Sequence, residues 1–121
     1  MTSHGSNVRI KRVYEQPAAE DGTRVLVDRL WPRGLTKERA HLDLWLKEVA
    51  PSTELRRWYG HDPLKFAEFR QRYLEQLREE PGSSAVERLR ALARQGPITL
   101  LFAAHDAERS EAAVVRDLLV Q

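Results

Sequence analysis

The chain has 121 residues, which is enough for one domain with its own hydrophobic core. It contains no cysteine, which excludes disulfides, thiolate catalysis and zinc sites built on sulfur. Its 20 basic and 18 acidic residues alternate along the predicted helices, as on solvated helix faces, and this argues against a nucleic-acid-binding surface.

Two strands are predicted near the N-terminus. Residues 1–7 are polar and are expected to be disordered, so a single domain is predicted over residues 8–121. Apolar residues predict one strand over 8–14 and a second over 24–30, centred on Val25-Leu26-Val27. Only nine residues join them, fewer than a parallel crossover usually needs, and Asp21-Gly22 is a turn signal. The residues alone therefore favour a hairpin here.

Helices are predicted over most of the next sixty or so residues. Thr36 caps a helix that runs to about Val49, with one apolar face formed by Leu42, Trp45, Leu46 and Val49. Ser52 caps a short turn through Trp58. Asp62-Pro63 begins a helix that runs to about Glu79. Ser84 opens a further helix, which Gly96-Pro97 ends.

A third strand is predicted over 98–104, and a last helix over about 108–120. The second and third strands are short, continuous apolar runs, which is typical of strands buried on both faces of a parallel sheet. The expected fold is therefore α/β: a small, mostly parallel sheet of about three strands covered by about five helices, doubly wound and flavodoxin-like. No segment approaches the roughly 18 apolar residues of a membrane helix. A cytoplasmic location is expected.

Two strand ends carry residues suited to chemistry, because ligands of open α/β sheets bind beyond the carboxyl ends of the strands. The segment after the second strand contains Asp28, Arg29, Trp31, Arg33 and Gly34. Arginine suits phosphate or carboxylate, and a glycine lets backbone N–H groups approach an anion. This pattern predicts an anion site with Arg29 and Arg33 as clamps. The structural alternative is that Asp28 forms an ion pair with one of these arginines and that Trp31 belongs to the core.

His105-Asp106 follows the third strand. His105 is a candidate general acid or base, whereas Asp106 is expected to cap the last helix rather than to orient the histidine. His61 precedes Asp62-Pro63 and would reach the same cleft if the helical segment folds over the sheet. The histidine spacing shows no paired metal-binding motif, and no phosphate loop, dinucleotide fingerprint or nucleophile elbow is present. The sequence therefore predicts no metal and specifies no cofactor.

Four blocks occur in order along the chain. They are Arg-Val-Leu-Val-Asp-Arg-Leu-Trp-Pro-Arg-Gly-Leu (24–35), Leu-Trp-Leu-Lys-Glu-Val-Ala-Pro-Ser (44–52), Leu-Arg-Arg-Trp with Gly-His-Asp-Pro (55–63), and Thr-Leu-Leu-Phe-Ala-Ala (99–104). Together they resemble the YeaO-like branch of the bacterial family called domain of unknown function 488. The resemblance implies a doubly wound α/β fold with parallel first strands, and a signature loop from Asp28 to Gly34. It implies no activity. Members usually carry His-Asn where this chain has Arg109-Ser110.

Three functions follow as hypotheses. The first is binding or conversion of a small phosphate- or carboxylate-bearing molecule at the Asp28–Gly34 loop, with Asp28 and His105 as catalytic candidates. The second is a non-enzymatic protein-interaction module, which predicts an exposed apolar patch around Trp45 or Trp58. The third is nucleic-acid binding through the arginine-rich helices, which predicts a steep salt dependence. They are ranked in this order.

Overall fold

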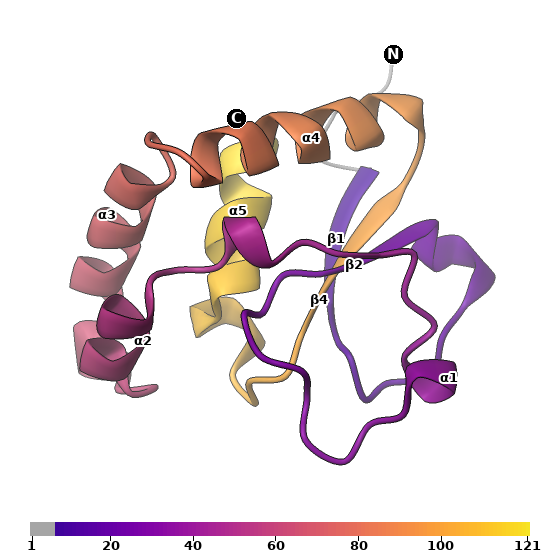
Figure 1. Ribbon diagram of the computed structural model, residues 1–121, viewed down its shortest axis with the longest axis horizontal. Coiled ribbons are helices and arrows are strands. Elements are labelled where there is room, and N and C mark those ends of the chain that lie inside the picture. Colours follow the sequence, from indigo (N-terminus) through magenta and orange to yellow (C-terminus); the bar gives the residue numbers. More distant parts are fainter. Residues whose placement is uncertain (1–6) are drawn as a thin grey trace.

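The computed structural model describes residues 7–121 and contains a four-stranded, all-parallel sheet (Figure 1). The strand order is β1-β4-β2-β3. The strands are β1 (Val8–Arg12), β2 (Thr23–Leu26), β3 (Leu44–Trp45) and β4 (Ile98–Phe102). The predicted α/β class with a parallel sheet is confirmed, with one strand more than expected. The predicted disordered segment lies, except for Asn7, outside the described residues.

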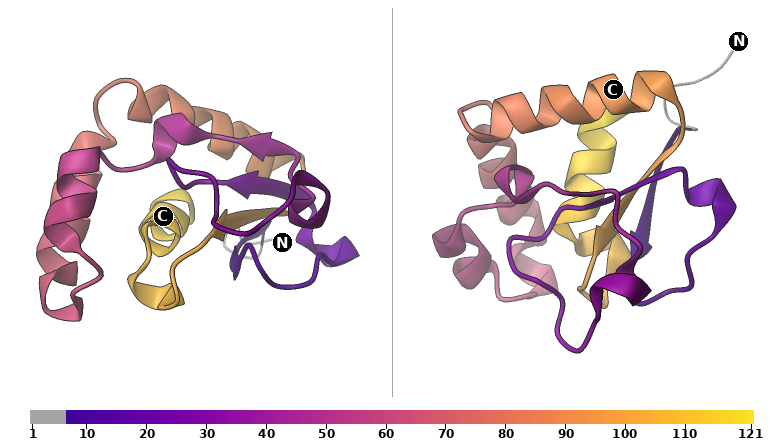
Figure 2. Two further views of the ribbon diagram at one scale, coloured as in Figure 1. Left: turned by 60° about the horizontal axis from the view of Figure 1, so that its bottom comes forward. Right: turned by 45° about the vertical axis from the view of Figure 1, so that its right-hand side comes forward.

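In the part of the chain that the structure describes, five α-helices and several short 3-10 helices lie between the strands or after the last one. The α-helices are α1 (Lys37–Ala40), α2 (Thr53–Tyr59), α3 (Phe66–Gln76), α4 (Gly82–Gln95) and α5 (Glu111–Leu119). Helix α5 packs on β1 and β4 and also contacts α3 and α4 (Figure 2). Helices α2 and α3 contact each other on the side of α5 that faces away from the sheet. Within residues 7–121, no helix is both long and apolar enough to cross a bilayer.

Alternate side chains of the two central strands enter two separate cores. Leu100 and Val25 point into the large core, which helices α3, α4 and α5 cover. Leu101 and Leu26 point into a smaller core with Ala40 of α1 on the opposite face of the sheet. This alternation explains why both strands read as continuous apolar runs, because neither face meets water.

The hairpin that the short connection favoured is absent, and β1 and β2 are parallel, as the family resemblance implied. They do not pair with each other, because β4 lies between them and pairs with both. The connection contains a 3-10 helix (Ala19–Asp21) and ends at Gly22. A Cβ on Gly22 would lie 2.1 Å from the carbonyl oxygen of Pro97. The turn signal at Asp21-Gly22 therefore marks a close approach of two backbones rather than a hairpin.

The predicted helix over 36–49 was wrong beyond its first turn. Thr36 caps α1 as predicted, but the helix ends at Ala40, and His41 adopts a left-handed conformation. The chain then extends as β3 along β2, with the Asp43 N–H donating to the Arg24 carbonyl at 2.9 Å. Apolar residues of this segment enter both cores: Leu42 and Trp45 the smaller one, and Leu46 and Val49 the larger one. They do not form one helical face.

Smaller corrections concern the ends of elements. Strand β2 ends at Leu26 instead of Leu30, which leaves Asp28 and the residues after it in a loop. Helix α4 begins at Gly82, ahead of Ser84. Asp106 makes no capping hydrogen bond; instead, Ser110 caps α5 by accepting a hydrogen bond from the Ala113 N–H at 3.2 Å. Serine satisfies the free N–H groups of a helix start as aspartate would.

Candidate functional site

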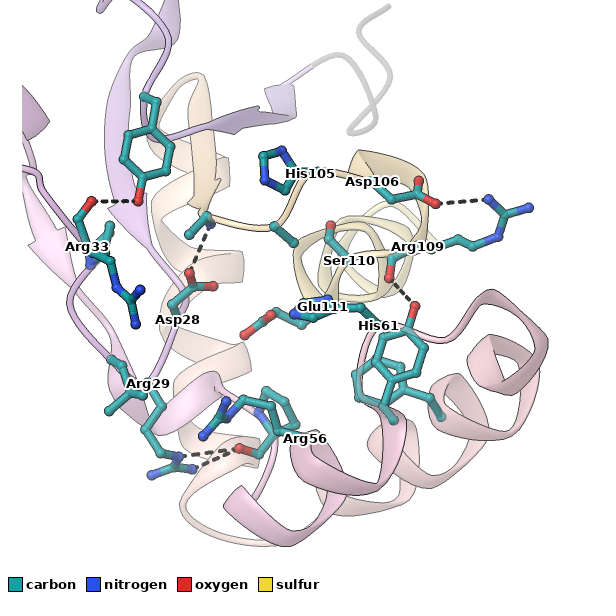
Figure 3. Close-up of a pocket in the computed structure, with 18 of the residues that line it drawn as sticks. Asp28, Arg29, Arg33, Arg56, His61, His105, Asp106, Arg109, Ser110 and Glu111 are labelled. Atoms are coloured by element: carbon teal, nitrogen blue, oxygen red, sulfur yellow. Dashed lines mark hydrogen bonds and ion pairs between the residues drawn. The ribbon is translucent and has the colours of Figure 1, made fainter.

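A cavity of about 890 Å³ opens at the edge of the sheet where β2 and β4 end (Figure 3). Its lining comes from the loop after β2, the loop after β4, helix α2 and its C-terminal turn, and the start of α5. The predicted residues Asp28, Arg29, Trp31, Arg33, His61 and His105 all line it. The structure thus brings the two predicted strand ends and His61 to one pocket, at the position that parallel sheets use for ligands.

Asp28 joins the two strand ends. Its Oδ2 accepts a hydrogen bond from the Ala103 N–H at 2.9 Å, and its carbonyl accepts one from the indole of Trp45 at 2.8 Å. The expected structural alternative, an ion pair of Asp28 with Arg29 or Arg33, does not occur in the described chain. Burial raises the pKa of the Asp28 carboxyl, although the Ala103 N–H and the neighbouring Glu111, His61 and Arg56 act against this rise.

Glu111, in the first turn of α5, points its carboxyl toward Asp28 (Figure 3). Burial raises the pKa of Glu111 well above its usual range, and the nearby Asp28 raises it further. Two adjacent carboxyls in a partly buried site resist double ionisation. The pair therefore holds a proton under conditions in which isolated carboxyls are both charged, and this proton belongs to the pair as a unit.

Arg56 projects from α2 toward the same carboxyls (Figure 3). Its charge lowers the pKa of both Asp28 and Glu111. Its Nε atom is buried, as is Oδ1 of Asp28, and neither atom has a hydrogen-bond partner among residues 7–121. Buried polar atoms without partners are rare in folded proteins and mark places where a ligand, water or proton is expected.

The two predicted clamps differ in their surroundings. The Arg29 guanidinium donates to the carbonyl of Pro51 at 3.2–3.3 Å and to that of Ala50 at 3.4 Å, which ties the signature loop to the chain before α2. Arg33 is exposed, and its backbone carbonyl accepts from the Tyr14 hydroxyl at 2.9 Å. Its guanidinium has no hydrogen bond or ion pair within residues 7–121. Arg33 therefore has its full donor capacity available to a ligand.

The other predicted residues contribute to the walls. Trp31 is partly buried, donates from its indole to the Leu35 carbonyl at 2.6 Å, and packs edge-on against Trp45 with ring centroids 5.3 Å apart. His61 and His105 are exposed at the pocket. Gly34 lies outside this cavity and lines a smaller one of about 350 Å³. Asp106 pairs with Arg109 at 2.9 Å, so its carboxylate has a partner other than His105.

Several lining residues were missed by the sequence reasoning, and Arg56, Glu111 and Tyr59 are the most informative of them. Arg56 and Tyr59 are three positions apart on α2, so they share one face of that helix. The Tyr59 ring stacks on Phe69 at 4.2 Å, and its hydroxyl donates to the Arg109 carbonyl at 2.7 Å. Glu111 directly follows the Ser110 cap, a position usually explained by the helix dipole alone.

The fold and the site define a class of protein: a small α/β domain with a parallel sheet and a polar, arginine-lined pocket at the carboxyl ends of its strands. A family model described as the inactive DUF488-N3 subclade matches residues 7–121. The chain therefore belongs to this family, and the resemblance to domain of unknown function 488 is confirmed.

The relatives are uncharacterised proteins. The chain is 46% identical over 114 residues to the uncharacterised protein Rv3073c of Mycobacterium tuberculosis, covering 94% of each chain. It is 42% identical over 113 residues to the uncharacterised protein YeaO of Escherichia coli, covering 93% of this chain and 96% of the relative. No solved structure matches significantly.

Proposed function

We propose that the protein binds a small molecule carrying a phosphate or carboxylate group in the 890 Å³ pocket, with Arg33 contacting the anionic group. The observation that carries this proposal is the unpaired Arg33 guanidinium at a cavity with three further arginines, Arg29, Arg56 and Arg109. A planar guanidinium offers paired donors that match the oxygens of phosphate and carboxylate. Arg29 is assigned to positioning the loop, because its Nε and Nη2 already donate to backbone carbonyls.

Binding without conversion is the preferred form of this proposal. The family that matches the chain is described as inactive. Arg109-Ser110 stands where the resemblance implies His-Asn, and Ser110 is occupied as a helix cap. Asp28 and His105, the catalytic candidates from sequence, are then wall residues of a binding pocket. The cytoplasmic location stays a prediction.

The two alternatives receive less support. Trp45 and Trp58 are both partly buried and packed against a core, which disfavours an exposed aromatic docking patch. Trp58 also lies beneath Lys65 and Arg72, whose charged groups are 5.1 and 4.6 Å from its ring. Several basic residues of the helices, among them Arg72, Arg90 and Arg116, pair with neighbouring acids, and Arg116 lies 2.9 Å from Glu108. This pairing disfavours a nucleic-acid surface.

The proposal is tested by isothermal titration calorimetry with inorganic phosphate, glycerol 3-phosphate and citrate at fixed ionic strength. Arg33→Ala is compared with Arg57→Ala, which removes the same charge from an exposed position outside the pocket. Loss of a charge-assisted hydrogen bond should weaken binding by about 10- to 100-fold in Arg33→Ala, with Arg57→Ala unchanged. Equal weakening in both variants, or no binding by the wild type, would contradict the proposal.

A further inference from the structure

The inner end of the pocket has a different chemistry from the Arg33 side. There the carboxyls of Asp28 and Glu111 face each other, one from the loop after β2 and one from the start of α5, and Arg56 approaches both from α2 (Figure 3). An arrangement of two acids and one base does not suit a bare anion. This end of the pocket is therefore expected to contact a different chemical group of the ligand.

The unpartnered oxygen of Asp28 indicates where the proton of the carboxyl pair lies. Oδ1 of Asp28 is buried without a donor among residues 7–121, and Glu111 is the neighbouring acid. A proton on Glu111 that is donated to Asp28 satisfies this oxygen. Because Glu111 lines the cavity, its second oxygen then remains an acceptor for a ligand. Arg56 also lines the cavity, and its guanidinium makes no hydrogen bond or ion pair among residues 7–121, so it supplies a donor beside Glu111.

The charge of this subsite selects among ligand groups. A carboxyl pair that shares one proton carries a single negative charge, and Arg56 balances it. A ligand ammonium would be repelled by Arg56. A second anionic group would be repelled by the negative charge of the carboxyl pair. A hydroxyl is neutral and both donates and accepts, so it can donate to Glu111 and accept from Arg56 at once.

We infer that Glu111 and Arg56 form a hydroxyl-binding subsite, so that the ligand is a polyhydroxylated anion, such as a sugar phosphate or a sugar acid. This inference rests on the proposed function, because the anionic group of the same molecule is the one that Arg33 contacts. The cavity, at about 890 Å³, has room for a molecule of this size.

The test measures, by calorimetry, the affinities for glucose 6-phosphate and for n-hexyl phosphate, which carries the same anion without the hydroxyls. Gluconate and hexanoate form the matching carboxylate pair. The readout is the affinity for the hydroxylated probe divided by the affinity for its hydroxyl-free partner, measured for the wild type and for Glu111→Leu. Hydrogen bonds to Glu111 and Arg56 predict that this ratio falls by about 10-fold or more in the variant, with binding of the hydroxyl-free anion nearly unchanged. Glu111→Gln keeps a donor and an acceptor and should retain most of the preference.

Each other outcome overturns a specific part of the reasoning. An unchanged ratio in Glu111→Leu, with both anions bound, removes the hydroxyl subsite and leaves the proposed function standing. Absence of binding by all four probes in the wild type removes the proposed function and the subsite with it. If Glu111→Leu does not fold, the same affinity ratio is measured for Arg56→Met. A ratio in Arg56→Met that equals the wild-type ratio counts equally against the inference.

Discussion

Gly22 offers a sharp test of how the sheet is assembled. It ends the short connection between β1 and β2, with φ 64° and ψ −136°, a conformation that is almost confined to glycine. A Cβ at this position would lie 2.1 Å from the Pro97 oxygen and 2.7 Å from the Pro97 carbonyl carbon. Both atoms are backbone and cannot rotate away. Gly22→Ala therefore forces the starts of β2 and β4 apart.

The magnitude follows from three costs and one gain. Backbone strain costs about 1–3 kcal/mol, and overpacking adds about 1–3 kcal/mol. Displacing Pro97 weakens the hydrogen bond from the Thr23 N–H, 3.0 Å long, for about 1 kcal/mol. The less flexible unfolded chain returns about 0.4–1 kcal/mol. The expected loss is about 3–5 kcal/mol, or roughly 10–20 °C in Tm for a domain of this size.

The assay is urea and thermal unfolding followed by circular dichroism, with two matched glycine variants. Gly34→Ala adds a Cβ at φ 75° with no atom within 4 Å, so it should cost only about 1 kcal/mol. Gly96→Ala meets no atom within 4 Å in extended backbone and should be close to neutral. Similar losses in Gly22→Ala and Gly34→Ala would refute the close approach at Pro97 as the cause.

The remaining predictions concern charged groups. Because the pKa of Glu111 is raised above its ordinary 4.5, the folded state binds more protons than the unfolded chain, and wild-type stability falls as pH rises beyond that value. Glu111→Gln should therefore gain stability over wild type at pH 8 and lose the advantage near pH 4; a pH-independent difference in urea midpoints would contradict this. Arg24→Met should cost about 3–5 kcal/mol in urea unfolding, because the Asp21 carboxylate and the Ala40 and His41 carbonyls lose a buried donor, and a loss below 1 kcal/mol would count against this role. Arg29→Ala should lower stability by about 1–3 kcal/mol, because the carbonyls of the buried residues Ala50 and Pro51 lose their donor, whereas Arg33→Ala should stay within about 0.5 kcal/mol. Equal losses in the two variants would contradict the assignment of Arg29 to positioning and of Arg33 to ligand contact.

The fold was predictable from sequence where apolar runs are unambiguous. Strands β2 and β4 are bounded by Gly or Pro and buried on both faces, so their patterns allow little else. The segment 41–49 was not, because Leu42, Trp45, Leu46 and Val49 fit a helical face as well as an extended chain crossing a sheet edge. Only the pairing with β2, a contact distant in sequence, decides between them.

The candidate site divides in the same way. Asp28, Arg33 and His105 could be predicted to share a pocket because they follow strands that run parallel, and parallel strands end at one edge. Glu111 and Arg56 could not, since each lies among other charged residues on a helix. Which charge faces inward depends on how α2 and α5 pack, and this is set by tertiary contacts rather than by local pattern.

The central position of β4 has a consequence for how the chain folds. β1 is made first but pairs only with β4, which comes near the end of the chain, and β2 has only the two-residue β3 as a partner until β4 is made. During synthesis, most of the sheet cannot form until β4, which ends at Phe102, has left the ribosome. Non-local pairing of this kind slows folding. A chain that stops at Pro97 should leave β1 unpaired and β2 with β3 as its only partner, so that their apolar side chains are open to aggregation or to a chaperone.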